Sequence, residues 1–457
     1  MKKYHLIGIG GISMSGIASY LLHKGYRVSG SDVKDNHLLE NLRKEEVEIY
    51  IGHYASNLND VDFVVVSSAI PEDNVELTYA RDQGIPILKR AELIAQFMDK
   101  KKGIAISGTH GKTTTTSMLS MILNKAETSP TVMLGGELSN IGGNLQIGTG
   151  EYFLAEADES DGSLLYFNPL LVIVTNIELD HLDYYDSQVK LLNTFQKFIN
   201  NIPENGQAVL CAEDENIQKL IAYGDERIMT YGFTKGNIRA RDIKLLPFGS
   251  YFTVEYNNNK LGTINLRIPG KHNILNALAT IGASMYLGLS FTDIQKALKS
   301  YSGVKRRFEK KGLIGDILVV DDYAHHPTEI KAVLQATQKT GYERIIAVFQ
   351  PHRYTRTKHL LKEFSKAFDL ADHLIITDIY SAGEKPIKGI NSKKLFDKTA
   401  KNSSDIKIDY IKKLADVTQY LQQIIKPKDL ILTIGAGDVY KVGEMLIKNM
   451  KKQREMA

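Results

Sequence analysis

The stretch GIAISGTHGKTTTT, residues 103–116, is the most informative segment for the fold of the central part of the chain. Its first five residues are mostly apolar and of strand length, Gly108 and Gly111 allow a tight loop, and the threonines open a helix. A strand, a glycine loop and a helix start in this order are typical of a phosphate-binding loop. Backbone N–H groups would hold phosphate oxygens, Lys112 would neutralise their charge, and the Thr113 hydroxyl would ligate Mg²⁺.

Strand-length apolar runs alternate with helical stretches along most of the chain, which predicts an α/β fold with parallel sheets. The runs occupy residues 4–9, 27–31, 47–52, 62–68, 103–107, 152–155, 170–175, 207–211, 317–320, 345–349, 373–377 and 430–434. Residues 227–268 differ, because alternating segments flank the turn Asn257–Asn259 and predict an antiparallel appendage. Residues 273–301 are expected to be helical, and the polar residues 302–315 are expected to form a linker.

Two polar clusters directly follow strand-length runs in the central part of the chain. Their members are Glu156, Asp158 and Glu159 after one run, and Asn176, Glu178, Asp180, His181 and Asp183 after the next. Because the carboxyl ends of parallel strands meet at one edge of a sheet, these groups should face the phosphate loop. Carboxylates with an imidazole would suit a Mg²⁺-nucleotide there. Solvated loop charges are the alternative, and the commoner fate of a single acidic residue.

A second glycine loop, GIGG at residues 8–11, follows the first strand-length run, and a helical pattern begins at Met14. The loop resembles a dinucleotide fingerprint, in which glycines let the backbone approach a pyrophosphate at a helix N-terminus. Asp32 ends the second run, where a ribose contact is common. Ser13 stands where the third glycine of that fingerprint belongs, which weakens an NAD interpretation. A different diphosphate is favoured, and a tight turn without a ligand remains the alternative.

Two further clusters follow strands near the C-terminus, at residues 321–327 (DDYAHHP) and 350–356 (QPHRYTR). If the second cluster starts a helix, Arg353 and Arg356 fall on one face. Paired guanidiniums suit a carboxylate or a phosphate, and a surface ion pair is the alternative. The glycine-rich turn Gly435–Asp438 has an equivalent position, and we interpret it as structural.

Composition limits the possible partners of this chain. The 457 residues are 43% hydrophobic and 24% charged, and 57 Lys and Arg against 53 Asp and Glu leave a net charge of +4. Such a small excess predicts neither nucleic-acid binding nor attachment to an anionic membrane. No apolar run approaches the roughly 20 residues of a membrane span, and no signal peptide is recognisable. A single cysteine, Cys211, excludes an intramolecular disulfide, and we expect a cytoplasmic protein.

Taken together, these segments resemble the Mur ligase family over nearly the whole chain. The resemblance rests on HLIGIGG (residues 5–11) with Met14–Gly16, GTHGKTTT (108–115), EADESD (156–161), TNIELDHLDY (175–184), GKHNILN (270–276), RRFE (306–309), DDYAHHPTE (321–329) and HRYTRT (352–357). The phosphate loop and the GKHNILN segment are shared with a wider superfamily that includes folylpolyglutamate synthases. The N-terminal glycine segment and HRYTRT resemble the L-alanine-adding branch.

The resemblance implies a three-domain α/β architecture. Residues 1–100 would form a Rossmann-like domain that binds a UDP-sugar, and residues 101–305 a P-loop ATPase domain with an antiparallel appendage. Residues 306–457 would form a Rossmann-like domain that binds the amino acid and closes on ATP. The implied reaction is ATP-dependent, passes through an acyl phosphate, and joins L-alanine to UDP-N-acetylmuramate for peptidoglycan synthesis. Mg²⁺ or Mn²⁺ would be the cofactor, and catalysis would depend on positioning and charge stabilisation.

Matching positions imply which residues serve each substrate. The ATP set comprises Gly108, Thr109, His110, Gly111, Lys112, Thr113, Thr114, His272, Asn273, Asn276 and Asp322, and the metal set comprises Thr113, Glu156 and His181. The UDP-sugar set is Gly8, Gly10, Gly11, Asp32 and Ser68, and the L-alanine set is Tyr323, His325, Arg353 and Arg356. Catalytic roles are implied for Lys112, Glu156, His181, Arg307 and His325.

The resemblance also predicts a difference from sister ligases, which carry a carbamylated lysine on the helix after the histidine loop. Gln196 takes that place here, with Lys197 beside it, so we expect no carbamyl-lysine. A recycling ligase that attaches a tripeptide to the same sugar is the main rival. A folylpolyglutamate synthase would lack the first domain, an NAD-dependent oxidoreductase would leave the phosphate loop unexplained, and a non-catalytic nucleotide-binding regulator would not need every phosphate and metal group. We expect a monomer or a weak homodimer.

Overall fold

Two compact units make up the chain in the computed structural model, which describes residues 1–138, 143–180, 184–222, 224–403 and 405–456. The first unit consists of Met1–Leu179, Ser187–Arg239 and Leu278–Ala297. The second unit consists of Asp180–Asp186, Ala240–Ala277 and Leu298–Ala457.

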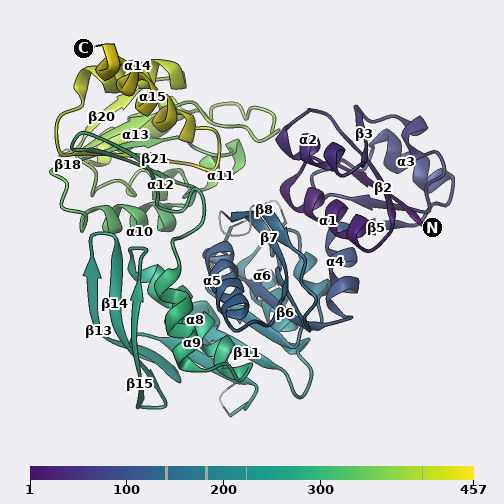
Figure 1. Ribbon diagram of the computed structural model, residues 1–457. Coiled ribbons are helices and arrows are strands. Elements are labelled where there is room, and N and C mark those ends of the chain that lie inside the picture. Colours follow the sequence, from purple (N-terminus) through teal and green to yellow (C-terminus); the bar gives the residue numbers. More distant parts are fainter. Residues whose placement is uncertain (139–142, 181–183, 223, 404, 457) are drawn as a thin grey trace. The chain divides into compact units, whose positions relative to one another are not determined.

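The first sheet of the first unit is entirely parallel, with the strand order β3-β2-β1-β4-β5. It is formed by the N-terminal part of the chain, coloured purple in Figure 1. Its strands are β1 (Lys3–Ile7), β2 (Arg27–Asp32), β3 (Glu48–Ile51), β4 (Phe63–Val66) and β5 (Ile87–Lys89). The connecting helices are α1 (Ile12–His23), α2 (His37–Lys44), the 3₁₀ turn η1 (Ala55–Leu58), α3 (Val75–Asp82) and α4 (Arg90–Met98). Ile7 is level with Ser31 and Val66 in the sheet register, so the loops after β1, β2 and β4 leave the same edge.

The second sheet carries the phosphate loop, and its strands in the first unit follow the order β12-β11-β10-β6-β9-β7-β8. They are β6 (Lys102–Ser107), β7 (Thr131–Leu138), β8 (Gly143–Gln146), β9 (Tyr152–Glu156), β10 (Leu171–Val174), β11 (Gln207–Cys211) and β12 (Ile228–Gly232). Its helical segments are α5 (Lys112–Lys125), η2 (Ser163–Tyr166), α6 (Gln188–Asn200), α7 (Glu215–Gln218), α8 (Lys271–Tyr286) and α9 (Phe291–Ser300). Because β6 lies between β10 and β9, the phosphate loop is flanked by the loops of both polar clusters.

The predicted antiparallel appendage is confirmed for the strands β14 (Gly249–Tyr256) and β15 (Asn259–Leu266). The earlier part of residues 227–268 differs from the prediction, because β12 pairs in parallel fashion with β11 and with β13 (Ile238–Leu246). β14 and β15 pair in antiparallel fashion up to the closing pair Tyr256 and Asn259. Asn257 and Asn258 have φ angles of 47° and 68°, the left-handed conformation that a two-residue hairpin turn requires. Asparagine tolerates this conformation better than most residues, which is why the three-asparagine segment predicted the turn correctly.

The third sheet belongs to the second unit and has the order β16-β17-β21-β18-β19-β20. Its strands are β16 (Glu309–Ile314), β17 (Ile317–Asp322), β18 (Arg344–Phe349), β19 (His373–Ile376), β20 (Lys407–Tyr410) and β21 (Asp429–Ile434). The helices are α10 (Pro327–Thr337), α11 (Tyr354–His359), α12 (Leu361–Phe364), α13 (Ser392–Asn402), α14 (Leu414–Ile424) and α15 (Tyr440–Met456). Apolar residues of α10, α12 and α13 cover one face of the sheet, and those of α14 and α15 cover the other.

One expectation about local structure was wrong. The predicted linker 302–315 contains the edge strand β16, which pairs antiparallel with β17. Its charged residues are tolerated because they have partners at the edge: Lys311 pairs with Glu444, and the ammonium of Lys310 lies over the Phe248 ring. Residues 273–301 are helical as expected and form two helices, α8 and α9, separated near Gly288, whose φ is +77°. The short strands β5, β7, β8 and β20 were not predicted at all.

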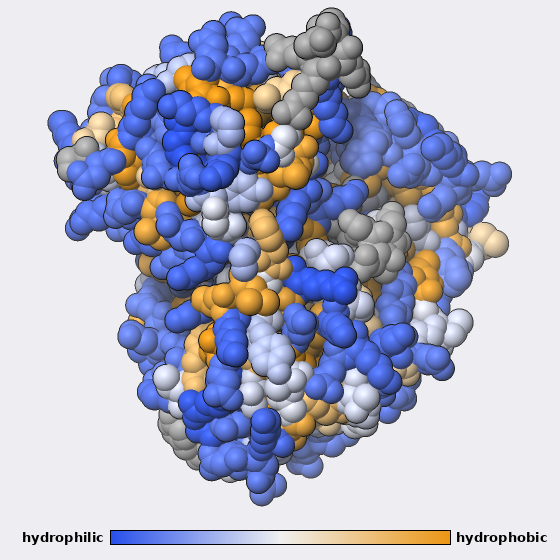
Figure 2. Space-filling view, turned by 60° about the vertical axis from the view of Figure 1, so that its left-hand side comes forward, coloured by the Kyte–Doolittle hydropathy of each residue, from blue (hydrophilic) through white to orange (hydrophobic). Residues whose placement is uncertain are grey.

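Among the described residues, no helix combines the length and the apolar character that crossing a membrane requires. Charged and polar side chains predominate on the face shown in Figure 2, where apolar side chains form separate patches between them.

Candidate active site

The phosphate loop spans the turn from β6 to α5, as predicted. Gly108 and Gly111 have φ angles of +128° and +82°, a region that other residues rarely adopt. A Cβ atom at Gly108 would lie 2.2 Å from the Thr175 hydroxyl and 2.9 Å from the Asn176 carbonyl oxygen, so only glycine fits this close approach. The loop ends at the N-terminus of α5, where the helix dipole and backbone N–H groups favour an anion.

The loop after β10 is bound tightly to the phosphate loop. The Thr109 and His110 amides donate to the Asn176 carbonyl (3.1 Å) and side-chain oxygen (2.9 Å). The Thr109 hydroxyl donates to the Glu178 carbonyl at 3.1 Å and accepts from the Glu178 amide at 2.8 Å. The expected convergence of this loop on the phosphate loop is confirmed.

Thr113 and Glu156 form the described part of the candidate metal site. The Thr113 hydroxyl lies 3.1 Å from a Glu156 carboxylate oxygen, and the Gly135 amide donates to the other oxygen at 2.9 Å. Adjacent oxygen ligands of an octahedral Mg²⁺ are about 3.0 Å apart, given metal–oxygen bonds of about 2.1 Å, so this pair fits one ion. Burial raises the pKa of Glu156, although the Gly135 amide, Lys112 and Thr113 oppose that shift. The third predicted ligand, His181, lies outside the described residues.

Lys112 reaches a carboxylate that the sequence did not connect to it. Its ammonium lies 2.8 and 2.9 Å from the two oxygens of Glu159 and 2.5 Å from the Gly108 carbonyl oxygen. Burial works against the charged form, but the negative charges of Glu159, Asp158 and Glu156 outweigh it and raise the pKa of Lys112. The lysine therefore carries its full charge beside the phosphate loop at neutral pH.

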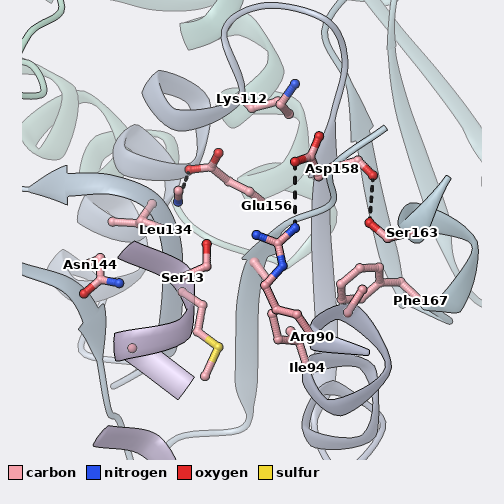
Figure 3. Close-up of a pocket in the computed structure, with 15 residues that line it drawn as sticks. Ser13, Arg90, Ile94, Lys112, Leu134, Asn144, Glu156, Asp158, Ser163 and Phe167 are labelled. Carbon is pink, nitrogen blue, oxygen red and sulfur yellow. Dashed lines mark hydrogen bonds and ion pairs between the residues drawn. The ribbon is translucent and has the colours of Figure 1, made fainter. Parts of the chain in front are cut away.

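A pocket lies between α1, the helix that follows the glycine loop, and the start of α5, the helix that follows the phosphate loop (Figure 3). Its volume is about 80 Å³, and its lining includes Ser13, Gly16, Arg90, Ile94, Lys112, Leu134, Asn144, Glu156, Asp158, Ser163 and Phe167. The Arg90 guanidinium points toward Asp158, with 3.8 Å between nitrogen and oxygen. Arg90 was not predicted as a site residue, although its place directly after the strand β5 was a usable signal.

The predicted UDP residues share one edge of the first sheet. The Gly10 amide donates to a carboxylate oxygen of Asp32 at 2.9 Å, and a Cβ at Gly10 would lie 2.8 Å from that oxygen. Gly8, with a φ of +82°, donates to the Ser31 carbonyl at 2.8 Å, and Gly11 precedes α1. Ser68 is exposed in the loop after β4. Asp32 therefore accepts a hydrogen bond from the glycine loop, a structural role that the sequence did not predict.

In the second unit, Asp322 is the last residue of β17, and Arg307 lies just before β16. The two carboxylate oxygens of Asp322 accept from the amides of Phe308 (2.7 Å) and Ala324 (2.8 Å), and burial raises its pKa to about 7. The Arg307 guanidinium lies 3.4 Å from Glu329 and 5.1 Å from the centre of the Tyr323 ring. Asp322 thus links the backbone at Phe308 to the backbone at Ala324, in addition to any contact with a ligand.

His325 and His352 lie side by side at the same edge, with ring centres 5.9 Å apart. Burial lowers the pKa of His325 to about 4 and that of His352 to about 3, so both rings are neutral at pH 7. Nδ1 of His325 lies 3.0 Å from the Tyr323 carbonyl oxygen, which can only accept. Nδ1 therefore carries the proton, and Nε2 is left as a hydrogen-bond acceptor.

Arg356 is buried, and its guanidinium donates to Asp180 at 3.1 Å. Its Nε–H is buried and finds no acceptor among the described residues. A carboxylate ligand could accept a hydrogen bond from this Nε–H. Arg353 is not in the helix: it precedes α11 with a φ of +70°. The expectation that the two arginines share a helix face was therefore wrong, because the helix begins one residue too late.

The remaining predicted ATP residues begin α8. Gly270 has a φ of +99°, and a Cβ there would lie 2.5 Å from the ring of His272, which is exposed. The buried Asn273 side chain donates to the Pro269 carbonyl at 2.7 Å, and Asn276 donates to Asn273 at 3.3 Å. Thr114 is buried inside α5. On α6, the Gln196 amide donates to Asn200 at 3.2 Å, and the absence of a carbamyl-lysine stays a prediction.

Sequence profiles identify the class to which this fold and site belong. The Mur ligase family catalytic domain matches residues 3–102, the Mur ligase middle domain matches residues 106–284, and the Mur ligase glutamate ligase domain matches residues 306–437. The chain belongs to the Mur ligase family. The predicted family and the predicted three-domain α/β fold class are confirmed.

Within that family, the chain is similar to proteins named UDP-N-acetylmuramate–L-alanine ligase. The one from Dictyoglomus turgidum is 47% identical over 457 residues, which cover 100% of this chain and 98% of the relative. The one from Acetivibrio thermocellus is 49% identical over 452 residues, which cover 98% of this chain and 96% of the relative. The crystal structure of UDP-N-acetylmuramate–alanine ligase from Thermotoga maritima superposes with a TM-score of 0.84 at 31% identity, covering 99% of this chain and 100% of that one.

Proposed function

We propose that this chain joins L-alanine to UDP-N-acetylmuramate, with ATP as co-substrate, in peptidoglycan precursor synthesis. The pocket of Figure 3 carries the proposal, because its lining includes Ser13 of α1, the helix that follows the glycine loop, together with Lys112 and Glu156. A nucleotide-sugar anchored by its diphosphate at the glycine loop would present its carboxylate to the phosphoryl donor. The names of the relatives, at 47–49% identity, support the same substrates.

The chemistry balances in two steps. A carboxylate oxygen of UDP-N-acetylmuramate attacks the γ-phosphorus of ATP, the bond to the β-γ bridging oxygen breaks, and ADP leaves. The amine of L-alanine, having lost one proton, then attacks the acyl carbon and phosphate leaves as the amide forms and releases a second proton. Lys112 stabilises the charge of the transferring phosphoryl group, and Arg90 is suitably placed to orient the sugar carboxylate.

Thr113 and Glu156, with His181, would hold Mg²⁺ or Mn²⁺, which would neutralise phosphate charge. The remaining ATP contacts would come from residues 108–114, His272, Asn273, Asn276, Asp322 and Arg307. The UDP part would be bound by Gly8, Gly10, Gly11, Asp32 and Ser68. For L-alanine, the buried Nε–H of Arg356 would bind the carboxylate with Arg353, and Nε2 of His325, beside Tyr323, would accept a hydrogen bond from the amine.

The domain boundaries follow the same proposal: residues 1–100 for the UDP-sugar, 101–305 for ATP and 306–457 for the amino acid. We also propose a cytoplasmic protein, monomeric or weakly dimeric, that binds no nucleic acid and does not insert into a membrane.

Phosphate release tests the function directly. Purified protein with ATP, Mg²⁺ and UDP-N-acetylmuramate should release phosphate when L-alanine is added, and mass spectrometry should detect UDP-N-acetylmuramoyl-L-alanine. A tripeptide that supports turnover better than L-alanine would identify the recycling ligase instead. Oxidation of NADH without phosphate release would contradict any ligase.

A further inference from the structure

The Lys112–Glu159 pair lies where the phosphate loop meets the start of α5. Glu159 follows β9 in the loop 157–162, and its side chain is only 2% exposed. That loop is fixed by its own hydrogen bonds, because the Leu164 amide and the Ser163 hydroxyl both donate to the Asp158 carbonyl. The Glu159 carboxylate therefore lies beside Lys112 in a loop that forms internal hydrogen bonds.

Lys112 has no donor to spare in this arrangement. An ammonium group carries three N–H donors. The Gly108 carbonyl oxygen at 2.5 Å and the two Glu159 oxygens at 2.8 and 2.9 Å account for all three. A phosphate oxygen can bind the ammonium only if one of these contacts is given up.

Negative charge near the loop adds to that cost. Glu156, Asp158 and Glu159 all lie close enough to Lys112 to raise its pKa. A nucleotide brings further negative charge to the same place, and like charges repel strongly where burial reduces screening. Once a phosphate oxygen accepts a hydrogen bond from the Lys112 ammonium, the negative charge of the buried Glu159 carboxylate is less completely neutralised.

We propose that Glu159 competes with the nucleotide phosphates for the Lys112 ammonium and so sets the affinity for ATP. This inference rests on the proposed function, because it assumes that the loop binds ATP. Glu159 acts through Lys112 and is a positioning residue. It lowers nucleotide affinity and does not stabilise the transition state.

Glu159→Gln tests the competition, since glutamine keeps the size of the side chain and removes its charge. Isothermal titration of the full-length protein with ADP should give roughly tenfold tighter binding than for the wild type. Asp161→Asn is the matched control: it removes one charge from the same loop and keeps the side-chain oxygen that accepts from the Ser163 amide. Its affinity for ADP should stay within about twofold of the wild type.

Initial rates separate competition from a role in the chemical step. Glu159→Gln should lower the KM for ATP roughly tenfold and leave kcat at saturating ATP within about threefold. Unchanged or weaker ADP binding, or a kcat that falls about a hundredfold with an unchanged KM, would overturn the proposal. If the glutamine variant does not fold, Glu159→Asp, which retracts the carboxylate, should still bind ADP more tightly than the wild type. A wild-type protein that binds no ADP or ATP contradicts the proposed function itself.

Discussion

Replacing Arg356 should weaken the binding of L-alanine without affecting ATP. In the structure its guanidinium is 8% exposed, donates to Asp180 at 3.1 Å, and has a buried Nε–H with no acceptor among the described residues. A charge-assisted contact from this group to a small carboxylate is worth about 1.5–3 kcal/mol. Arg356→Ala should therefore raise the KM for L-alanine roughly tenfold to a hundredfold.

The same substitution also affects stability, and a second variant separates the two effects. Arg356→Ala removes the guanidinium from Asp180, whose side chain is only 10% exposed, and loss of one partner of a buried pair costs about 3 kcal/mol. The double variant Asp180→Ala/Arg356→Ala removes both charges and should recover much of that stability. The high KM for L-alanine should remain in the double variant, because the carboxylate contact is still missing.

Initial-rate kinetics with each substrate varied in turn, combined with thermal unfolding of the three proteins, measure these quantities. Arg353→Ala, at the other arginine proposed to bind the carboxylate, should also raise the KM for L-alanine and leave the KM for ATP nearly unchanged. A double variant with a normal KM for L-alanine would show that the guanidinium does not bind the carboxylate. A shift in the KM for ATP alone would assign Arg356 to the nucleotide.

Three further predictions concern charge. Lys112→Ala should lower kcat at least a hundredfold, because the lysine compensates the charge of the moving phosphoryl group. It should also lower the melting temperature, because Glu159 loses its ammonium partner. Near-normal turnover would show that Lys112 has no part in the mechanism. Burial, with His325 and Arg356 nearby, lowers the pKa of His352 to about 3. Between about pH 3 and 6.5 the unfolded chain therefore binds about one more proton than the folded chain, and the free energy of unfolding rises with pH across that window. His352→Gln should reduce the slope of unfolding free energy between pH 4 and 6 by about 1.4 kcal/mol per pH unit, and an unchanged slope in denaturant titrations would contradict this. EDTA should abolish phosphate release and Mg²⁺ or Mn²⁺ should restore it, whereas activity that persists in EDTA would exclude a metal held by Thr113 and Glu156.

Local sequence patterns predicted the phosphate loop and the hairpin turn correctly, because the backbone conformations they require depend on a few neighbouring residues. Gly108 and Gly111 were expected to form a tight loop, and both have positive φ angles. The linker at residues 302–315 was predicted wrongly for the opposite reason. β16 is a strand only because β17 pairs with it, and its own charged residues indicate a loop.

The sequence by itself determined the family, the α/β class and the edge of each sheet at which polar residues gather, since parallel strands all end at one edge. Only the tertiary structure showed which side chains pair with one another within each site. Arg356 meets Asp180 across 176 residues, Lys112 meets Glu159 across 47, and Arg90 reaches Asp158 from a different sheet. Such pairs depend on strand order and side-chain burial, which arise only when distant segments pack together, and no local pattern of residues encodes them.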